Sequence, residues 1–199
     1  MACTITSGRN VPCKSAFGGI KAVYFCNYGD IASTTISTSG ATTGQVTAIA
    51  MASGKLFFEY KVKGNSSLTT TITSSRDNGT TFYTQTLALT LPYLDIETQQ
   101  EIQLLAVSRP QMIVEDYYGN KFLCGYENGM DLTGGTIVTG AAAGDLSGFT
   151  LTMEGMEETA PHFMLSSLVP GDPTIVSATR ITPTGAWCFF WFKIKALLR

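Results

Sequence analysis

The sequence is poor in charged residues. They make up 14% of the 199 residues, whereas hydrophobic residues make up 44%; soluble domains more usually carry about a quarter charged residues. No apolar run reaches about 18 residues, so a membrane span does not account for this composition. The apolar stretch 187–192 is too short to cross a bilayer and is followed by Lys193, Lys195 and Arg199. We therefore expect part of the apolar surface to be buried against sister subunits.

Residue patterns that support catalysis or metal binding are also scarce. His162 is the single histidine, and we interpret it as a loop histidine without a catalytic role. Glu115 and Asp116 alternate across an expected strand, so their carboxylates point apart. The glycine runs that begin at Gly134 and Gly140 match neither a phosphate-binding loop nor a dinucleotide fingerprint. The sequence therefore predicts no catalytic residue, no metal site and no cofactor.

The cysteines show no pattern of a disulfide framework or a zinc site. They are odd in number and lack CxxC or CxxH spacing: Cys3, Cys13, Cys26, Cys124 and Cys188. They indicate reduced thiols of a protein made in a cytosol, with a Cys3–Cys13 bridge as an alternative. The first six residues have neither a basic start nor an apolar core, so we expect no signal peptide.

Charge is distributed unevenly along the chain. The net charge is −2, so the composition does not indicate a basic surface that binds nucleic acid. Residues 1–63 carry +4, residues 64–163 carry −9 and residues 164–199 carry +3. The two ends of the chain are positively charged and its middle is negatively charged. Such opposite charges suit surfaces that attract each other when two copies of the chain meet. Uneven solvated charge is the alternative interpretation.

Most of the chain has the pattern of β-strands. Residues 55–63 alternate, with Leu56, Phe58, Tyr60 and Val62 on one face and Phe57 as an exception on the other. Residues 83–91 and 149–153 alternate in the same way, as half-buried antiparallel strands do. Strands are also expected at 112–117 and 121–126, joined through Tyr118-Gly119-Asn120.

One helix is expected from Ile96 to about Ser108. Asp95 can cap it, and Pro110 stops it. Ile102, Leu105 and Ala106 share one face, which should pack on a sheet.

Three segments have the composition of loops. Residues 28–44 are rich in serine, threonine and glycine, and residues 134–148 are rich in glycine and alanine. Residues 65–81 form a polar hairpin or long loop with its turn at Asp77-Asn78-Gly79.

The order of these pieces resembles bacteriophage tail tube proteins and their ring-forming relatives. The resemblance covers roughly residues 55–161: a long strand, one packed helix, a strand and hairpin, a glycine-rich loop and a last strand. That last strand begins Gly144-Asp145-Leu146-Ser147-Gly148-Phe149-Thr150-Leu151-Thr152 and leads to Pro161. The residues before 55 and after 163 match nothing that we can place.

The resemblance implies a mainly β fold, an antiparallel β-sandwich or barrel with one packed α-helix. Residues 1–163 would form this domain, with an N-terminal arm at about 1–18. Residues 164–199 would be a C-terminal extension at the exterior or between subunits.

Six copies would form a ring, and rings would stack into a tube that closes the open strand edges. DNA would pass through the channel during ejection. The expected partners are further copies of the chain, other phage tail or connector proteins and genomic DNA that is not bound specifically. The expected location is the tail of a virion assembled in the host cytoplasm.

The expected site residues fall into two groups. The long hairpin and the aromatic end supply candidate subunit contacts: Ser66, Thr70, Arg76, Asp77, Asn78, Trp187, Phe190 and Trp191. A channel that lets a polyanion slide should repel it, so some of the following carboxylates are expected to face the channel: Glu115, Asp116, Glu127, Asp131 and Asp145. Ordinary outer solvation is the alternative for these acids.

Other functions remain open from the sequence. Within assembly proteins, the alternatives are a collar, adaptor or baseplate ring and the tube protein of a secretion machine. A ligand-binding β-sandwich module is an alternative of another class, as is a hydrolase that uses His162.

Overall fold

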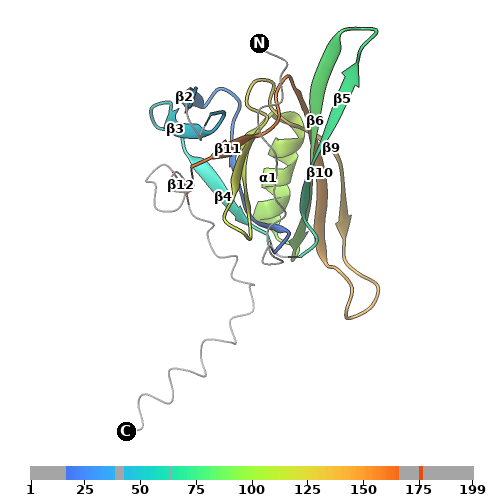
Figure 1. The fold of residues 1–199 in the computed structure, drawn as a ribbon. Helices are drawn as coiled ribbons and strands as arrows, with labels where there is room; N and C mark the ends of the chain where they lie inside the picture. Colours follow the sequence, from blue (N-terminus) through green and yellow to red (C-terminus); the bar gives the residue numbers. More distant parts are fainter. Residues whose placement is uncertain (1–16, 39–42, 63, 166–174, 177–199) are drawn as a thin grey trace.

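A computed structural model describes residues 17–38, 43–62, 64–165 and 175–176, which form a mainly β fold with one helix (Figure 1). The larger sheet is curled into a half-barrel of eight strands in the order β12-β4-β1-β7-β8-β11-β3-β2. Its strands are β1 (Ile20–Cys26), β2 (Ile31–Ile36), β3 (Val46–Met51), β4 (Phe57–Lys61), β7 (Gln111–Asp116), β8 (Lys121–Cys124), β11 (His162–Met164) and β12 (Ile175–Val176).

The smaller sheet is antiparallel throughout. Its order is β5-β6-β10-β9, and its strands are β5 (Ser67–Ser75), β6 (Thr80–Pro92), β9 (Asp131–Val138) and β10 (Gly148–Glu157). The helix α1 (Ile96–Val107) follows β6, and Figure 1 shows it in front of the space between the two sheets.

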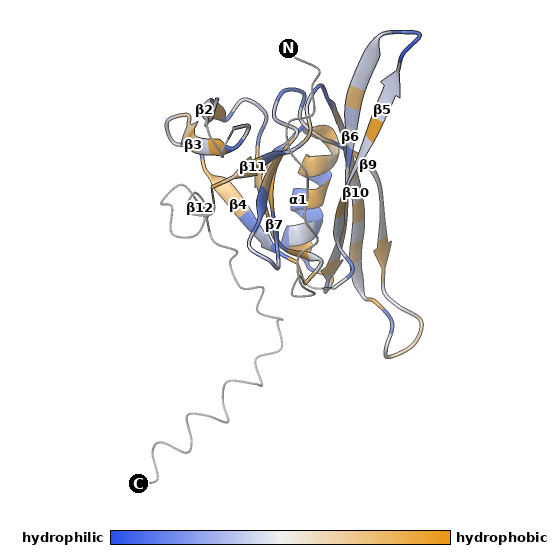
Figure 2. Ribbon diagram, viewed as in Figure 1, coloured by the Kyte–Doolittle hydropathy of each residue, from blue (hydrophilic) through white to orange (hydrophobic). Residues whose placement is uncertain are grey.

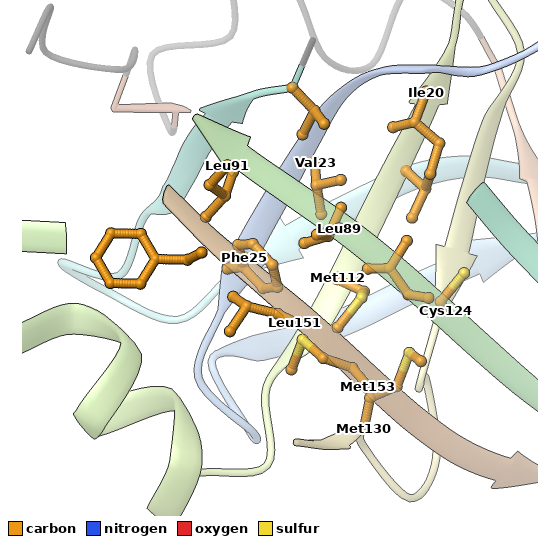
Figure 3. Packing of buried hydrophobic residues seen from close by; sticks show 14 residues of the cluster. Ile20, Val23, Phe25, Leu89, Leu91, Met112, Cys124, Met130, Leu151 and Met153 are labelled. Carbon is orange, nitrogen blue, oxygen red and sulfur yellow. The ribbon is translucent and has the colours of Figure 1, made fainter. Parts of the chain in front are cut away.

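The main core lies between the two sheets. Alternating side chains of β6 and β10 point toward the large sheet and meet Val23, Phe25 and Met112 (Figure 3). From β6 and β10 the cluster includes Leu87, Leu89, Leu91, Phe149, Leu151 and Met153. The even alternation of these strands predicts this single buried face, because successive side chains point to opposite sides of a sheet.

A second core lies inside the curl of the large sheet. It contains Tyr24, Val46, Phe57 and Ile113, contributed by strands from both halves of that sheet. The central strands β1 and β7 are therefore buried on both faces. This double burial explains the apolar runs Ala22–Cys26 of β1 and Met112–Val114 of β7, which lack the alternation of a half-buried strand.

Most strands predicted from alternation are confirmed. β4, β6, β7, β8 and β10 lie where the sequence indicated. Phe57 lies on the face opposite Tyr60 and Val62, as the alternation indicated, but it is buried in the second core, whereas Phe58 is exposed. β4 lies between the two cores, so apolar residues pack against both of its faces.

Two of the predicted loops are partly strands. β2 lies within residues 28–44 and pairs with β3, and β9 occupies the first part of residues 134–148. Their serine, threonine and glycine content suggested loops, but both strands lie at the edges of their sheets. Threonine and isoleucine favour strands, which accounts for β2, and the glycines of β9 are tolerated because an edge strand has a partner on one side only.

The third loop-like segment is a hairpin. β5 and β6 pair from Ser67↔Ala88 to Ser75↔Thr80, and the turn contains Arg76, Asp77 and Asn78. Figure 1 shows the distal half of this hairpin projecting past the rest of the fold.

The helix begins and ends as predicted. The Asp95 side chain accepts a hydrogen bond from the Thr98 backbone N–H, which caps the N-terminus. Ile102 and Leu105 pack on the main core, whereas Ala106 is exposed. The described residues therefore cover only a narrow face of α1.

Candidate interaction surfaces

The outward face of the four-stranded sheet is a surface of threonine side chains. We define this outward face as the side opposite the main core. Strand register places the following threonines on it: Thr69, Thr71, Thr73, Thr84, Thr86, Thr90, Thr136, Thr150 and Thr152. Adjacent hydroxyls are close enough to bond, since Thr136 Oγ1 and Thr150 Oγ1 lie 2.5 Å apart. The strands appear mostly pale in Figure 2, interrupted by apolar bands.

The strand residues of this outward face carry little charge, and all of it is negative. However, Arg109, which precedes β7, lies beside one of these acids, with its Nε 3.5 Å from Oδ1 of Asp131. None of the strands β5, β6, β9 and β10 contains lysine or arginine. Asp131 and Glu154, which pair in register, are the acids on the face. Glu154 was not among the residues predicted from the sequence. The alternation of Phe149, Leu151 and Met153 with polar residues could have placed it there, since Glu154 follows the outward Thr150 and Thr152.

The two outer strands of this sheet have open edges. Within the described residues, β5 pairs with β6 alone, and β9 pairs with β10 alone. Each therefore presents a row of backbone N–H and C=O groups that can pair with another chain. β5 has nine residues and β9 has eight, so the two edges are of similar length.

The predicted channel acids are dispersed over the molecule. Glu115 was wrongly predicted to face a channel, because it is only 4% exposed and lies within the large sheet. Asp116 binds the backbone N–H and the side chain of Asn120 in the β7–β8 turn. Glu127 lies in the exposed segment between β8 and β9. Of the five, Asp131 alone lies on the outward face.

Asp145 lies in the exposed loop between β9 and β10. Its side chain accepts hydrogen bonds from the backbone N–H groups of Ala141 and Ala142, at 3.0 and 2.7 Å. These two bonds lower the pKa of Asp145, because they favour the charged carboxylate. The side chain therefore shapes its own loop.

The residues predicted to contact other subunits also lie in different parts of the structure. Ser66 is buried and accepts a hydrogen bond from the Thr90 backbone N–H, so it anchors the base of the hairpin within the chain. Thr70 lies on the core-facing side of β5, whereas Arg76, Asp77 and Asn78 are exposed at the hairpin turn. Trp187, Phe190 and Trp191 lie outside the described residues, as do most of the expected N-terminal arm and C-terminal extension.

A buried polar cluster lies inside the curl of the large sheet. Lys21 Nζ lies 2.6 Å from Oε1 of Glu115, and the Tyr24 hydroxyl donates to Oε2 at 3.0 Å. Burial and the Glu115 carboxylate raise the pKa of Tyr24, and burial lowers the pKa of Lys121, which pairs in register with Glu115. These contacts hold together β1, β7 and β8.

His162 lies in the short strand β11 and not in a loop. Its Nδ1 is 3.1 Å from the Gly44 carbonyl oxygen, so this nitrogen donates, and Nε2 is 3.4 Å from Thr159 Oγ1. Both contacts tie β11 to neighbouring segments. Within the part of the chain that the structure describes, no three histidine, cysteine, aspartate or glutamate residues are grouped as metal ligands. No helix among those residues is long and apolar enough to cross a membrane.

A groove of about 590 Å³ lies between the base of the long hairpin and the large sheet. One wall is formed by Leu68, Ile72 and Tyr83 of the hairpin. The other wall includes Ile20, Val114, Asp116, Phe122, Pro161 and Phe163. The groove is thus mainly apolar and lies beside the open edge of β5.

Comparison with known proteins gives no relative: no family model matches the chain, and no curated protein or solved structure is significantly similar to it.

Proposed function

We propose that this protein is a virion structural protein whose copies assemble head to tail into hexameric rings, and that the rings stack into the tail tube of a bacteriophage. The tube would be a conduit for DNA during ejection. The observation that carries the proposal is the four-stranded sheet, which combines two open edges with one exposed, weakly acidic face.

The strand directions favour a ring. Because β5, β6, β10 and β9 alternate in direction, β5 and β9 run opposite to each other. Rotation about an axis parallel to the strands keeps each direction, so β9 of one copy meets β5 of the next in antiparallel orientation. Such pairing continues the sheet. Ser67–Thr69 of β5 and Asp131–Gly134 of β9 lie level with the same part of β6, so a stagger between neighbouring copies is needed to close the full length of both edges.

The outward face suits the wall of a DNA channel. DNA binds strongly to surfaces that bring lysine and arginine to its phosphates. The four strands offer neither residue, and the face presents threonine hydroxyls together with Asp131 and Glu154. Arg109, which lies beside this face, is held by Asp131. A closed sheet with this face inward would let a polyanion pass without holding it.

The long hairpin supports stacking. Its exposed turn, with Arg76, Asp77 and Asn78, projects along the strand direction (Figure 1). In a ring whose axis is parallel to the strands, the turn would extend toward the next ring. The resemblance of residues 55–161 to tail tube proteins adds the subunit number and the location in a virion to the proposal.

Mass photometry of the purified protein at micromolar concentration tests the assembly, followed by electron microscopy. We expect particles of six times the chain mass and tubes of stacked rings. Single rings that never stack would favour a collar, adaptor or baseplate protein. A stable monomer that binds a glycan or a peptide would contradict ring assembly and favour a ligand-binding module.

A further inference from the structure

The outward side of α1 carries three exposed apolar side chains. Ile96, Leu104 and Val107 are 74%, 62% and 86% exposed. At 100° per residue they lie opposite Ile102 and Leu105, which face the core. Gln100 and Gln103 lie on the same side, and Glu97 borders it next to Leu104. Exposed apolar side chains that gather on one side of a helix indicate a surface that is covered by another protein surface.

The groove beside β5 is mainly apolar, as are the exposed side chains on the outward side of α1. Asp116 is the single charged residue that lines it, and its carboxylate is already bound by Asn120. Leu68, Ile72 and Tyr83 face the groove from the side of the sheet that elsewhere faces the main core. Over β5, this side of the sheet is therefore left partly uncovered within the described residues.

The helix and the groove lie at opposite ends of the same sheet. α1 contacts β9, and Ile102 lies beside Leu132 and Ile137 over the core-facing side of that strand. The groove lies over the core-facing side of β5. When β9 of one copy continues into β5 of the next, α1 and the neighbour's groove come together on one side of the joined sheet.

We propose that the outward side of α1 packs into the groove of the neighbouring copy and forms a second contact beside the paired strands. This inference rests on the proposed ring assembly. The occupant is a second copy because the described residues place the helix surface and the groove at opposite edges of one sheet, which is the arrangement of a head-to-tail ring. The one carboxylate of the groove, Asp116, keeps its two hydrogen bonds from Asn120, and the rest of the buried surface is mainly apolar, so the contact does not depend on ion pairs between copies.

A double-mutant cycle on the full chain tests the contact. Leu104→Glu changes the helix, and Ile72→Lys and Phe163→Lys each change the groove. Each single variant should raise the concentration at which rings form, on the order of tenfold or more, because it buries an unpaired charge. Leu104→Glu combined with either lysine should recover much of this loss, since the charges meet across each interface. Tyr118→Asp is the control, because Tyr118 is also 62% exposed but lies in the β7–β8 turn.

The outcomes separate the two proposals. If the parent chain forms rings and the effects of the substitutions are additive in both cycles, the helix–groove contact is overturned. Ring assembly is then still supported. Weaker assembly from the groove variants alone would assign the groove to another occupant, such as residues 1–16 or 177–199, and would also overturn it. A parent chain that stays monomeric would overturn both proposals. Far-ultraviolet circular dichroism should show that every variant folds.

Discussion

The Tyr24 hydroxyl donates a 3.0 Å hydrogen bond to the Glu115 carboxylate inside the curl of the large sheet. The second carboxylate oxygen is bound by Lys21, whose side chain is 56% exposed, whereas that of Glu115 is 5% exposed. Because Glu115 is the buried member, its hydrogen bonds offset the cost of removing its charge from water. The cluster is thus a structural element of the half-barrel.

We expect Tyr24→Phe to lower the free energy of unfolding by about 1.5–3 kcal/mol, because it removes a buried hydrogen bond to a charged group. Lys61→Ala is the control. Lys61 lies 3.9 Å from Glu59 and its side chain is 70% exposed, so its loss should cost less than about 1 kcal/mol. Urea denaturation monitored by fluorescence measures both, and equal effects would contradict the structural role of Tyr24.

Gly148 should not accept a side chain. A Cβ at this position would lie 2.1 Å from the Leu91 carbonyl oxygen, which belongs to the paired strand β6. Gly148→Ala should therefore destabilise the fold by about 1–3 kcal/mol, as overpacking does. At Gly134 in β9, a Cβ would meet no atom within 4 Å, so Gly134→Ala should be neutral or slightly stabilising. Thermal unfolding of the two variants compares them, and equal melting temperatures would refute the expected difference.

The thiols of Cys26 and Cys124 should react slowly in the folded protein. Both are buried, and burial raises the pKa of Cys26 from 9.0 to about 12 and the pKa of Cys124 further. Alkylation needs the thiolate, so at pH 9 both residues should be labelled at least about tenfold more slowly than in urea. Site-resolved mass spectrometry measures the rates.

The same shifts predict a loss of stability in alkali. The folded state keeps its thiol protons above pH 9, where the unfolded state releases them. The free energy of unfolding should therefore fall as the pH rises from about 9 toward 12. Replacement of Cys26 by alanine should reduce this dependence, and an unchanged slope would contradict the assignment.

The turn of the long hairpin should be needed for stacking but not for folding. Deleting Ser74, Ser75, Thr80 and Thr81 removes two register pairs and keeps the alternation of the strands. These residues are largely exposed, so stability should change by less than about 1 kcal/mol. Electron microscopy should show single rings in place of tubes, and tubes of unchanged length would exclude the hairpin from stacking.

How far the sequence predicts this fold can be judged from particular strands. β6 and β10 were evident because each has one buried face, which leaves a period of two in the sequence. β1 was missed, although Ala22-Val23-Tyr24-Phe25-Cys26 is a continuous apolar run. Such a run fits a strand buried on both faces, and only the curl of the sheet creates the second face.

The site residues show the same division. The exposed hairpin turn at Arg76, Asp77 and Asn78 follows from local turn chemistry, because Asn-Gly favours a tight reversal. Glu115 was misplaced because the sequence shows its charge but not Lys21 and Tyr24, which lie about ninety positions away and enclose it. Long-range pairs of this kind cannot be deduced from local patterns.

By itself, the sequence determined the β-rich class, the capped helix, the hairpin turns and the scarcity of basic residues in the middle of the chain. These features depend on neighbours a few positions apart and on composition. Tertiary structure alone decided which carboxylates are buried, which strand edges stay open and how the threonines of four strands form one face. Those properties depend on strand order and register, which bring distant residues together through backbone pairing.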